Sequence, residues 1–390
     1  MKLEKVQGYL CPVSAKTAWI FLEATLDEGV TGFGEATAFG AELAVMSEIA
    51  VFASALEDRP LEAIGPALQS LYAQNLPEAR RAVIRALEQA LFDAMSRSAG
   101  LSMAALLGGP YRNRVPAYAN INRGISDRSP EGFARQASGI LDEEGYRAIK
   151  IAPFDGYRWH RTGGREGREL IERGIARVHE VRAAVGPDVE ILVDCHGRFD
   201  RSSAETVMAE LYGADLFWIE EPVDSAVVDA AGQRAVRSAA HRVGIRTAGG
   251  ETLENLTQAT TLLSAGGFDV ILPDLRSTGI RTGMAMLELA VATGVSASLH
   301  NPVGPVLDAV SRHVAAAMPD FLILERQVRE TPLYDNLRGL PVDLADGAAD
   351  VELSGGNGLA IDREVLLAAA AKPFSPTRSY VGIAGAGPDA

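Results

Sequence analysis

Eight short apolar runs follow one another between residues 115 and 324. Each suits a buried β-strand, and the runs are residues 115–120, 148–151, 189–193, 216–219, 243–248, 270–272, 295–299 and 321–324. The segments between consecutive runs are long enough for a helix, for example at 131–144, 169–185, 203–212 and 253–264. Strands that alternate with helices predict parallel pairing through right-handed crossovers. Eight such units in about 210 residues predict a closed (β/α)₈ barrel.

The first hundred residues follow a different pattern. Residues 18–26 (AWIFLEATL) are β-prone, and the glycines of residues 29–34 supply a turn into a second strand. From about residue 42 to 107 apolar residues recur at helical spacing, until Gly-Gly-Pro at 108–110 breaks the pattern. We therefore predict an α/β chain with an N-terminal α+β domain at residues 1–112 and the barrel at 113–335. A C-terminal segment at 336–372 that returns to the first domain and a tail at 373–390 complete the division.

A doubly wound open sheet is the competing architecture, but no Gly-x-Gly-x-x-Gly turn follows an early strand. The composition of 47% hydrophobic and 23% charged residues suits large buried cores and excludes a disordered chain. A net charge of −14 argues against a nucleic-acid partner. The two cysteines, Cys11 and Cys195, are too few for a disulfide framework. No apolar stretch approaches about 20 residues, and the start of the chain lacks a signal peptide's apolar core, so a cytoplasmic location away from membranes is expected.

Acids and imidazoles follow six successive runs, at the end of the barrel where active sites form. These residues are Asp194 with His196, Glu220, Glu251, Asp274, His300 and Glu325. A single acid after a strand is usually a helix N-cap or a surface residue. A row of them repels itself unless a cation neutralises it. Carboxylates without a thiolate favour Mg²⁺, with Mn²⁺ second, and the His-x-His pair of a zinc amidohydrolase is absent.

The motifs at these strand ends resemble the enolase superfamily, in its mandelate-racemase-like group. They read Val-Asp at 193–194, Trp-Ile-Glu-Glu-Pro at 218–222, Gly-Gly-Glu at 249–251 and Leu-Pro-Asp at 272–274. The resemblance implies a capping α+β domain on a modified barrel, with one Mg²⁺ held by Asp194, Glu220 and Glu251. It also implies a small-molecule carboxylate as substrate, and we expect a homo-oligomer. Glu221 leaves the other face of its strand and is expected to be structural.

The same resemblance implies removal of the proton beside a carboxylate, with the metal stabilising the enediolate. One βα unit separates Asp274 from His300, so the two are expected within hydrogen-bond reach, and they match the family's Asp–His base. Glu325 matches the acid that hydrogen-bonds the second carboxylate oxygen. Its alternative is a rim glutamate paired with Arg326 or another arginine.

Two further residues bear on the reaction. His196 lies two residues after Asp194, and residues two apart on a strand share a face, so His196 is expected to point inward beside Asp194. The segments Asp-Cys-His-Gly-Arg at 194–198 and His-Asn-Pro at 300–302 resemble the galactonate-dehydratase branch. There a histidine at this position acts as general acid on a departing hydroxyl; alternatively His196 binds only a hydroxyl or water. Lys150, one of five lysines, ends the second run, where many relatives have Lys-x-Lys. Here Ala152 replaces the second lysine, which disfavours a two-base racemase. Lys150 then either neutralises the substrate carboxylate or forms a buried ion pair.

The leading hypothesis is a sugar-acid dehydratase that acts on an aldonate or aldarate and yields a 2-keto-3-deoxy acid. An epimerase, racemase or cycloisomerase that uses the same enediolate is the first alternative. A non-catalytic, metal-dependent sugar-acid binding protein is the second. Residues 33–42 correspond to the family's segment near the mouth of the site. Residues 153–167 are predicted to form a long loop, which is either a lid or a dimer contact.

Overall fold

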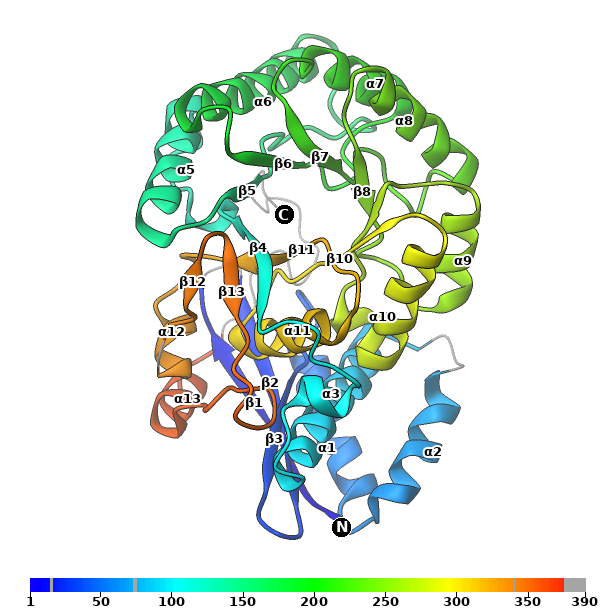
Figure 1. Ribbon diagram of the computed structural model, residues 1–390, viewed down its shortest axis with the longest axis vertical. Coiled ribbons are helices and arrows are strands. Elements are labelled where there is room, and N and C mark those ends of the chain that lie inside the picture. Colours follow the sequence, from blue (N-terminus) through cyan, green and yellow to red (C-terminus); the bar gives the residue numbers. More distant parts are fainter. Residues whose placement is uncertain (15–16, 73–75, 340, 375–390) are drawn as a thin grey trace.

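A small antiparallel sheet opens the chain and lies at the foot of the molecule (Figure 1). The computed structural model describes residues 1–14, 17–72, 76–339 and 341–374. Apolar side chains of the sheet and of the first and third helices share one core. The elements of this capping domain are β1 (Leu3–Pro12), β2 (Ala18–Leu26), β3 (Thr31–Glu35), α1 (Glu42–Leu56), α2 (Leu61–Tyr72) and α3 (Glu78–Ser98). The short helix α4 (Met103–Leu106) leads from it into the rest of the chain.

Eight parallel strands close into a barrel, because the last of them pairs with the first. They are β4 (Arg114–Asn120), β5 (Ala148–Ile151), β6 (Glu190–Asp194), β7 (Leu216–Glu220), β8 (Thr247–Gly249), β9 (Val270–Ile271), β10 (Ser296–Leu299) and β11 (Ile323–Gln327). Each predicted run overlaps one of them. The predicted (β/α)₈ barrel with an N-terminal α+β capping domain is confirmed.

Helices surround the barrel strands (Figure 1). They are α5 (Pro130–Glu144), α6 (Gly164–Val185), α7 (Arg201–Glu210), α8 (Ala230–Arg242), α9 (Leu256–Ser264), α10 (Leu275–Ala292) and α11 (Pro305–Ala317), and a single 3-10 turn, η1 (Asn122–Gly124), follows β4. Helix α6 begins five residues before the predicted 169, so the predicted 153–167 loop is shorter than expected. An extended Gly163 and Glu166 in the first turn favour that early start. Among the described helices, none is both long and apolar enough to cross a membrane.

Two layers of side chains fill the barrel, because residues two apart on a strand point to the same face. The lower layer is apolar and consists of Tyr118, Ala148, Leu192, Trp218, Ala248, Val270 and Ile323, and Leu272 packs against it. The rings of Tyr118 and Trp218 meet edge to face at 5.6 Å. Two residues further along five of these strands lie the buried polar residues Asn120, Lys150, Asp194, Glu220 and Glu325. These buried polar residues therefore pack directly on a layer of apolar side chains.

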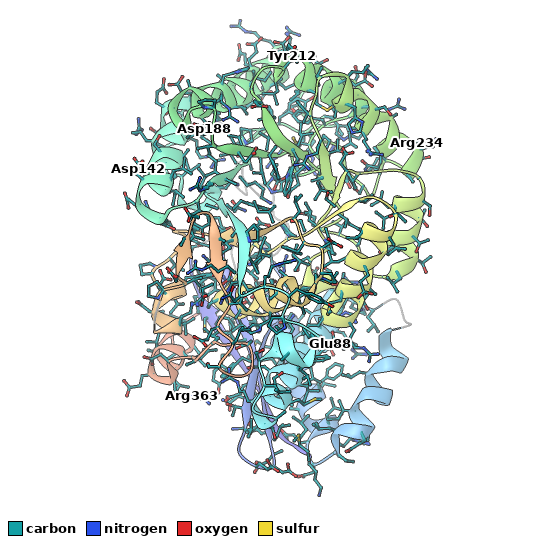
Figure 2. The ribbon with its side chains drawn as sticks, in the orientation of Figure 1. Glu88, Asp142, Asp188, Tyr212, Arg234 and Arg363 are labelled. Atoms are coloured by element: carbon teal, nitrogen blue, oxygen red, sulfur yellow. The ribbon has the colours of Figure 1, made fainter. Side chains whose placement is uncertain are left out.

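Two buried acids of the capping domain bind backbone N–H groups at the starts of barrel helices. Glu35 accepts hydrogen bonds from Gly304 N at 2.8 Å and Leu307 N at 2.9 Å, at the start of α11. Glu88, at the junction of the two domains (Figure 2), accepts one from Ile280 N at 2.9 Å, just after a kink in α10. Gly279 makes that approach possible, because a Cβ there would lie 2.1 Å from Glu88 Oε2. Carboxylates at helix N-termini thus fix the capping domain over the barrel.

The C-terminal segment contacts both domains. Its elements are α12 (Leu333–Arg338), β12 (Leu344–Ala345), β13 (Ala348–Asp350) and α13 (Arg363–Ala370). Strand β13 pairs antiparallel with β4 of the barrel. Arg363, which begins α13, donates to Glu23 Oε2 of the capping sheet at 2.7 Å. Most of the predicted tail, residues 375–390, lies outside the described residues.

Asp308 in α11 is the centre of a buried ionic network behind the polar layer. It accepts hydrogen bonds from Arg326 Nε at 2.9 Å and from Arg312 Nε at 3.1 Å, and Arg338 Nη1 lies 3.3 Å away. Burial alone would raise the pKa of Asp308, but the charges of these three arginines hold it well below its ordinary value. Asn301 also donates to Asp308 at 3.3 Å. The network therefore braces the chain next to His300 and Glu325.

Replacing Asp308 by Asn should lower the free energy of unfolding by about 3–5 kcal/mol, because buried guanidinium groups lose their counter-charge. The folded-state pKa is depressed, so the ionised carboxylate stabilises the wild type above the unfolded-state pKa of about 3.9 and loses that effect as the pH falls. Urea unfolding between pH 7 and pH 3 should show a steeper acid loss for the wild type than for the variant. Asp320→Asn, at an exposed position beyond α11, is the control. Equal stability of Asp308→Asn and wild type would contradict this role.

Candidate active site

The ammonium group of Lys150 lies among three carboxylates at the mouth of the barrel. Its Nζ is 2.7 Å from Glu220 Oε1, 3.0 Å from Glu325 Oε1 and 3.5 Å from Asp194 Oδ2. The side chains of Lys150, Glu220 and Glu325 have no exposed surface. Such a cluster is costly to bury unless its charges are paired. Lys150 thus joins two of the predicted metal ligands to Glu325, and the strand periodicity brings all four together.

The surroundings of Glu220 destabilise its ionised form. Its second oxygen accepts a hydrogen bond from Trp218 Nε1 at 3.0 Å. Burial raises the pKa of Glu220 to about 8, in spite of Lys150, and the neighbouring Asp194, Glu325 and Glu251 add to the rise. Bringing a further positive charge to this point would therefore stabilise the ionised carboxylate. That is the electrostatic environment of a cation site.

The adjacent Glu221 has a structural role, as expected. Its backbone adopts φ of 40°, and its carboxylate accepts hydrogen bonds from Gly250 N at 2.8 Å and Ser225 Oγ at 2.9 Å. Gly250 itself has φ of 105°, which favours glycine. Together they set the turn in which β8 ends, directly before Glu251. Glu221 thereby positions a predicted metal ligand from the neighbouring strand.

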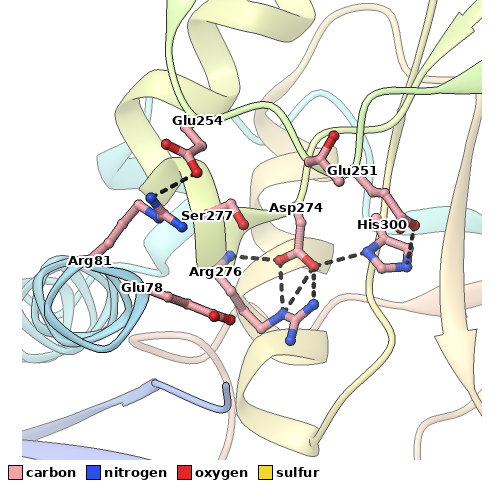
Figure 3. A pocket seen from close by; sticks show the side chains of 9 residues that line it. Glu78, Arg81, Glu251, Glu254, Asp274, Arg276, Ser277 and His300 are labelled. Atoms are coloured by element: carbon pink, nitrogen blue, oxygen red, sulfur yellow. Dashed lines mark hydrogen bonds and ion pairs between the residues drawn. The ribbon is translucent and has the colours of Figure 1, made fainter. Parts of the chain in front are cut away.

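Asp274 and His300 lie within hydrogen-bond distance, and an arginine that the sequence analysis did not identify joins them (Figure 3). His300 Nδ1 is 2.9 Å from Asp274 Oδ2, while His300 Nε2 is 3.1 Å from Glu251 Oε2. Arg276 contacts both oxygens of Asp274, with Nε at 3.1 and 3.0 Å. Burial alone would lower the pKa of His300, but Glu251, Glu325 and Asp274 raise it to about 9. A cation bound by Glu251 would offset the largest of these raising effects and favour the neutral imidazole, which can accept a proton. The hydrogen bond at Nδ1 leaves Nε2 facing the carboxylate cluster.

Arg276 also reaches the capping domain. Its Nη1 donates to Thr37 O at 3.2 Å, and its guanidinium lies 5.6 Å from the ring centre of Phe39. The guanidinium of Arg123, from the turn after β4, lies 5.1 Å from the centre of the same Phe39 ring. Residues 37–39 belong to the segment predicted to lie near the mouth. Arg276 therefore links that segment directly to the Asp274–His300 pair.

His196 lies beside Asp194, but a turn places it there and not strand alternation. Strand β6 ends at Asp194, and His196 has φ of 48°. Its backbone N donates to Asp194 Oδ1 at 2.9 Å, and its Nε2 lies 3.2 Å from Asp194 Oδ2. The side chain is 44% exposed, so it faces the open mouth of the barrel. The predicted 153–167 segment contacts this turn, since Arg158 Nη1 donates to His196 O at 3.2 Å.

Comparison with known proteins decides the family. A model described as "Enolase C-terminal domain-like" matches residues 132–365. The model of the N-terminal domain of mandelate racemase and muconate lactonizing enzyme matches residues 12–108. The chain belongs to the enolase superfamily. Its resemblance to the mandelate-racemase-like group, inferred from the strand-end motifs, is confirmed.

Relatives that align with most of this chain include two sugar-acid dehydratases and one solved structure of the same group. A D-gluconate dehydratase of Thermoproteus tenax is 32% identical over 360 residues, which cover 91% of this chain and 70% of the relative. A D-xylonate dehydratase of Haloferax volcanii is 27% identical, covering 91% and 86%. The crystal structure of a mandelate racemase/muconate lactonizing enzyme from Sulfitobacter sp. is 26% identical, with a TM-score of 0.84 and coverage of 96% and 97%.

The donor set of this superfamily member fits a hard divalent cation. Within the described part of the chain, ligand atoms of Glu220, Glu251 and His300 all lie within 4.8 Å of one another. Asp194 stands slightly apart and contacts Lys150 and His196 instead. Carboxylate oxygens that repel one another in a buried setting suit Mg²⁺. The set of Asp194, Glu220 and Glu251 stays a prediction, as do the roles of the catalytic residues.

Four residues of the site escaped sequence reasoning. Trp218 and Asn120 belong to the barrel's inner face, and the two-residue periodicity from Glu220 and the end of β4 could have found them. Asn120 Nδ2 donates to Glu325 Oε1 at 2.7 Å, and Asn301 N donates to Glu325 Oε2 at 3.0 Å. Arg276 follows Asp274 by two residues at the start of α10, a position that also suits a solvent-exposed side chain. No sequence signal marked it as a partner of the dyad.

Replacing Lys150 by Met should lower the free energy of unfolding by about 3–5 kcal/mol, because three buried carboxylates lose their counter-charge. Urea unfolding in a chelator measures this loss. The double variant Lys150→Met/Glu325→Gln should be more stable than the sum of the two single losses predicts, by about 0.5–3 kcal/mol. The reason is that Glu325 no longer carries the buried charge that Lys150→Met alone leaves without its partner. The same Lys-to-Met change at the exposed Lys372 is the control. Strict additivity would show that the two charges do not interact.

Proposed function

We propose that the chain is an Mg²⁺-dependent dehydratase of a sugar acid. The observation that carries the proposal is the placement of two imidazoles around one carboxylate cluster. His196 follows β6 and His300 follows β10, and these strands lie opposite each other in the closed eight-strand order. Elimination of water needs a base at one carbon and an acid at the next. The names of the gluconate and xylonate dehydratases support the same reaction type.

We assign the metal to Asp194, Glu220 and Glu251. When bound there, Mg²⁺ would supply Lewis acidity toward a substrate carboxylate. Support comes from the raised pKa of Glu220, about 8, which results from burial and from crowding by Asp194, Glu325 and Glu251. These ligands come from the ends of three adjacent strands, and Glu221 and Trp218 orient two of them.

Two protein groups account for the two proton transfers of the elimination, removal of the C2 proton and protonation of the departing hydroxyl. His300 Nε2 takes the proton from C2, while Asp274 and Arg276 hold the imidazole through Nδ1. Lys150 and Glu325 lie at the carboxylate end, where negative charge accumulates as the enediolate forms. The electron pair then expels the C3 hydroxyl, which takes a proton from His196 and leaves as water. The enol product tautomerises to a 2-keto-3-deoxy acid.

Dehydration is also favoured over reprotonation of C2 from the other side. Strand β5 ends Lys150-Ile151, and the next residue is the buried Ala152. A methyl group there cannot act as a second base. Besides His300, the described residues that contact the carboxylate cluster include one other imidazole, His196, which contacts Asp194.

A screen of aldonic and aldaric acids with Mg²⁺ tests the proposed function. We expect at least one acid to yield a 2-keto-3-deoxy product that semicarbazide detects, and a chelator to abolish the reaction because the metal stabilises the developing charge. His300→Asn is the inactive control. Epimerised substrate without keto acid would support the epimerase alternative. Binding without any turnover would support a sugar-acid binding protein.

The role of His196 is separable from that of His300. His196→Asn should reduce dehydration by about 10²–10⁴-fold, because the hydroxyl departs without a general acid. Exchange of the C2 hydrogen in D₂O should persist, since His300 still removes that proton. Both processes are measured on one sample, by NMR for exchange and by semicarbazide for product. Loss of both, with substrate still bound, would contradict the assignment of His196 as the leaving-group acid.

A further inference from the structure

A cavity of about 240 Å³ extends from the proposed base to the capping domain (Figure 3). His300, Glu251 and Asp274 line its inner end. Glu254, from the loop after β8, and Arg81, from α3 of the capping domain, line its outer end. Every described side chain that lines the cavity is charged or polar. A ligand that fills it must therefore offer hydrogen-bonding groups along its length.

Arg81 and Glu254 form an ion pair between the two domains at the outer end. Arg81 Nη1 lies 2.7 Å from Glu254 Oε1, and the two side chains are 19% and 32% exposed. Arg81 Nη1 also donates to Leu76 O at 3.4 Å. Within the described part of the chain both contacts use Nη1, so the N–H groups on Nε and Nη2 remain for a ligand. Glu254 likewise keeps acceptor capacity on its second oxygen.

The charge of the cavity lining favours a substrate whose distal end is neutral over one whose distal end carries a carboxylate. Arg276 is committed to Asp274, and Glu251 belongs to the proposed metal site. The remaining charged lining consists of Glu78, Glu254 and Arg81, which carry one net negative charge. A second carboxylate on the substrate would meet that net negative charge, and the cation among these three described residues, Arg81, is already paired with Glu254. Hydroxyl groups, which both donate and accept hydrogen bonds, match an arginine–glutamate pair.

We infer that Arg81 and Glu254 recognise the distal hydroxyl groups of an aldonic acid, and that they select against aldaric acids. The two are specificity-determining residues, and the substrate class narrows to monocarboxylic sugar acids long enough to span the cavity. This inference rests on the proposed function. The pair that would bind the far end of the substrate, Arg81 and Glu254, forms only when the capping domain sits on the barrel.

The test compares substrates of different length on matched variants. Wild type, Arg81→Met and Glu254→Gln are assayed with a set of stereoisomeric six-carbon aldonates, with four-carbon aldonates and with six-carbon aldarates. Arg80→Met is the control, because Arg80 is the neighbouring residue of the same helix and pairs with Glu48 at 2.9 Å, outside the cavity lining. Circular dichroism and the remaining turnover of four-carbon acids verify that each variant is folded.

The expected result is a change in substrate preference. The ratio of kcat/KM for six-carbon to four-carbon aldonates should fall about 10–100-fold in Arg81→Met, the loss expected for a charge-assisted hydrogen bond. This ratio should fall less in Glu254→Gln, because the amide oxygen of glutamine still accepts a hydrogen bond. Arg80→Met should keep the wild-type ratio. A ratio unchanged in Arg81→Met, or wild-type kcat/KM for an aldarate equal to that for the best aldonate, overturns the inference alone. A wild type that dehydrates none of the acids overturns the proposed function and the inference with it.

Discussion

The charge balance around Lys150 is the constraint on which the rest of the site depends. One buried ammonium lies within 3.5 Å of carboxylates from three other strands, above a floor of apolar side chains. No single strand could hold such a group, because the energy of an unpaired buried charge would expel it. Closure of the barrel supplies the partners simultaneously. The fold and the charge cluster therefore stabilise each other, and each strand must end in register for either to exist.

The capping domain completes this arrangement through polar contacts. Glu35 binds the start of α11, and Glu88 binds α10 just after its kink. These helices follow His300 and Asp274. Arg276 connects the Asp274 carboxylate to Thr37 O. The position of the base thus depends on where the cap sits as well as on the barrel. A carboxylate at a helix start tolerates little displacement, which suits a boundary that also shapes the substrate cavity.

The sequence predicts most of the barrel and the inner part of the site, for a definite reason. In a parallel barrel the last residue of each apolar run lies at the same rim, so Asp194, Glu220, Asp274, His300 and Glu325 could be listed without coordinates. Contacts between distant segments could not be foreseen. Arg276 and Thr37 are 239 residues apart, and the contact of Arg81 with Glu254 likewise depends on how the two domains dock. The turn that orients His196 was also missed, because strand β6 and its alternation end at Asp194.

The two-residue stacking of the polar layer on the apolar layer has a consequence for insertions and deletions. One residue added inside β5 would turn Lys150 out of the barrel and a neighbouring isoleucine into it, and similar additions would invert β6 or β7. Residues added between a strand end and the next strand leave the rim unchanged, as the long connection from β5 to β6 illustrates. Length variation compatible with this chemistry is thus confined to the loops and helices. Those loops include the one that carries Glu254, so substrate range can diverge while the proton-transfer apparatus stays in place.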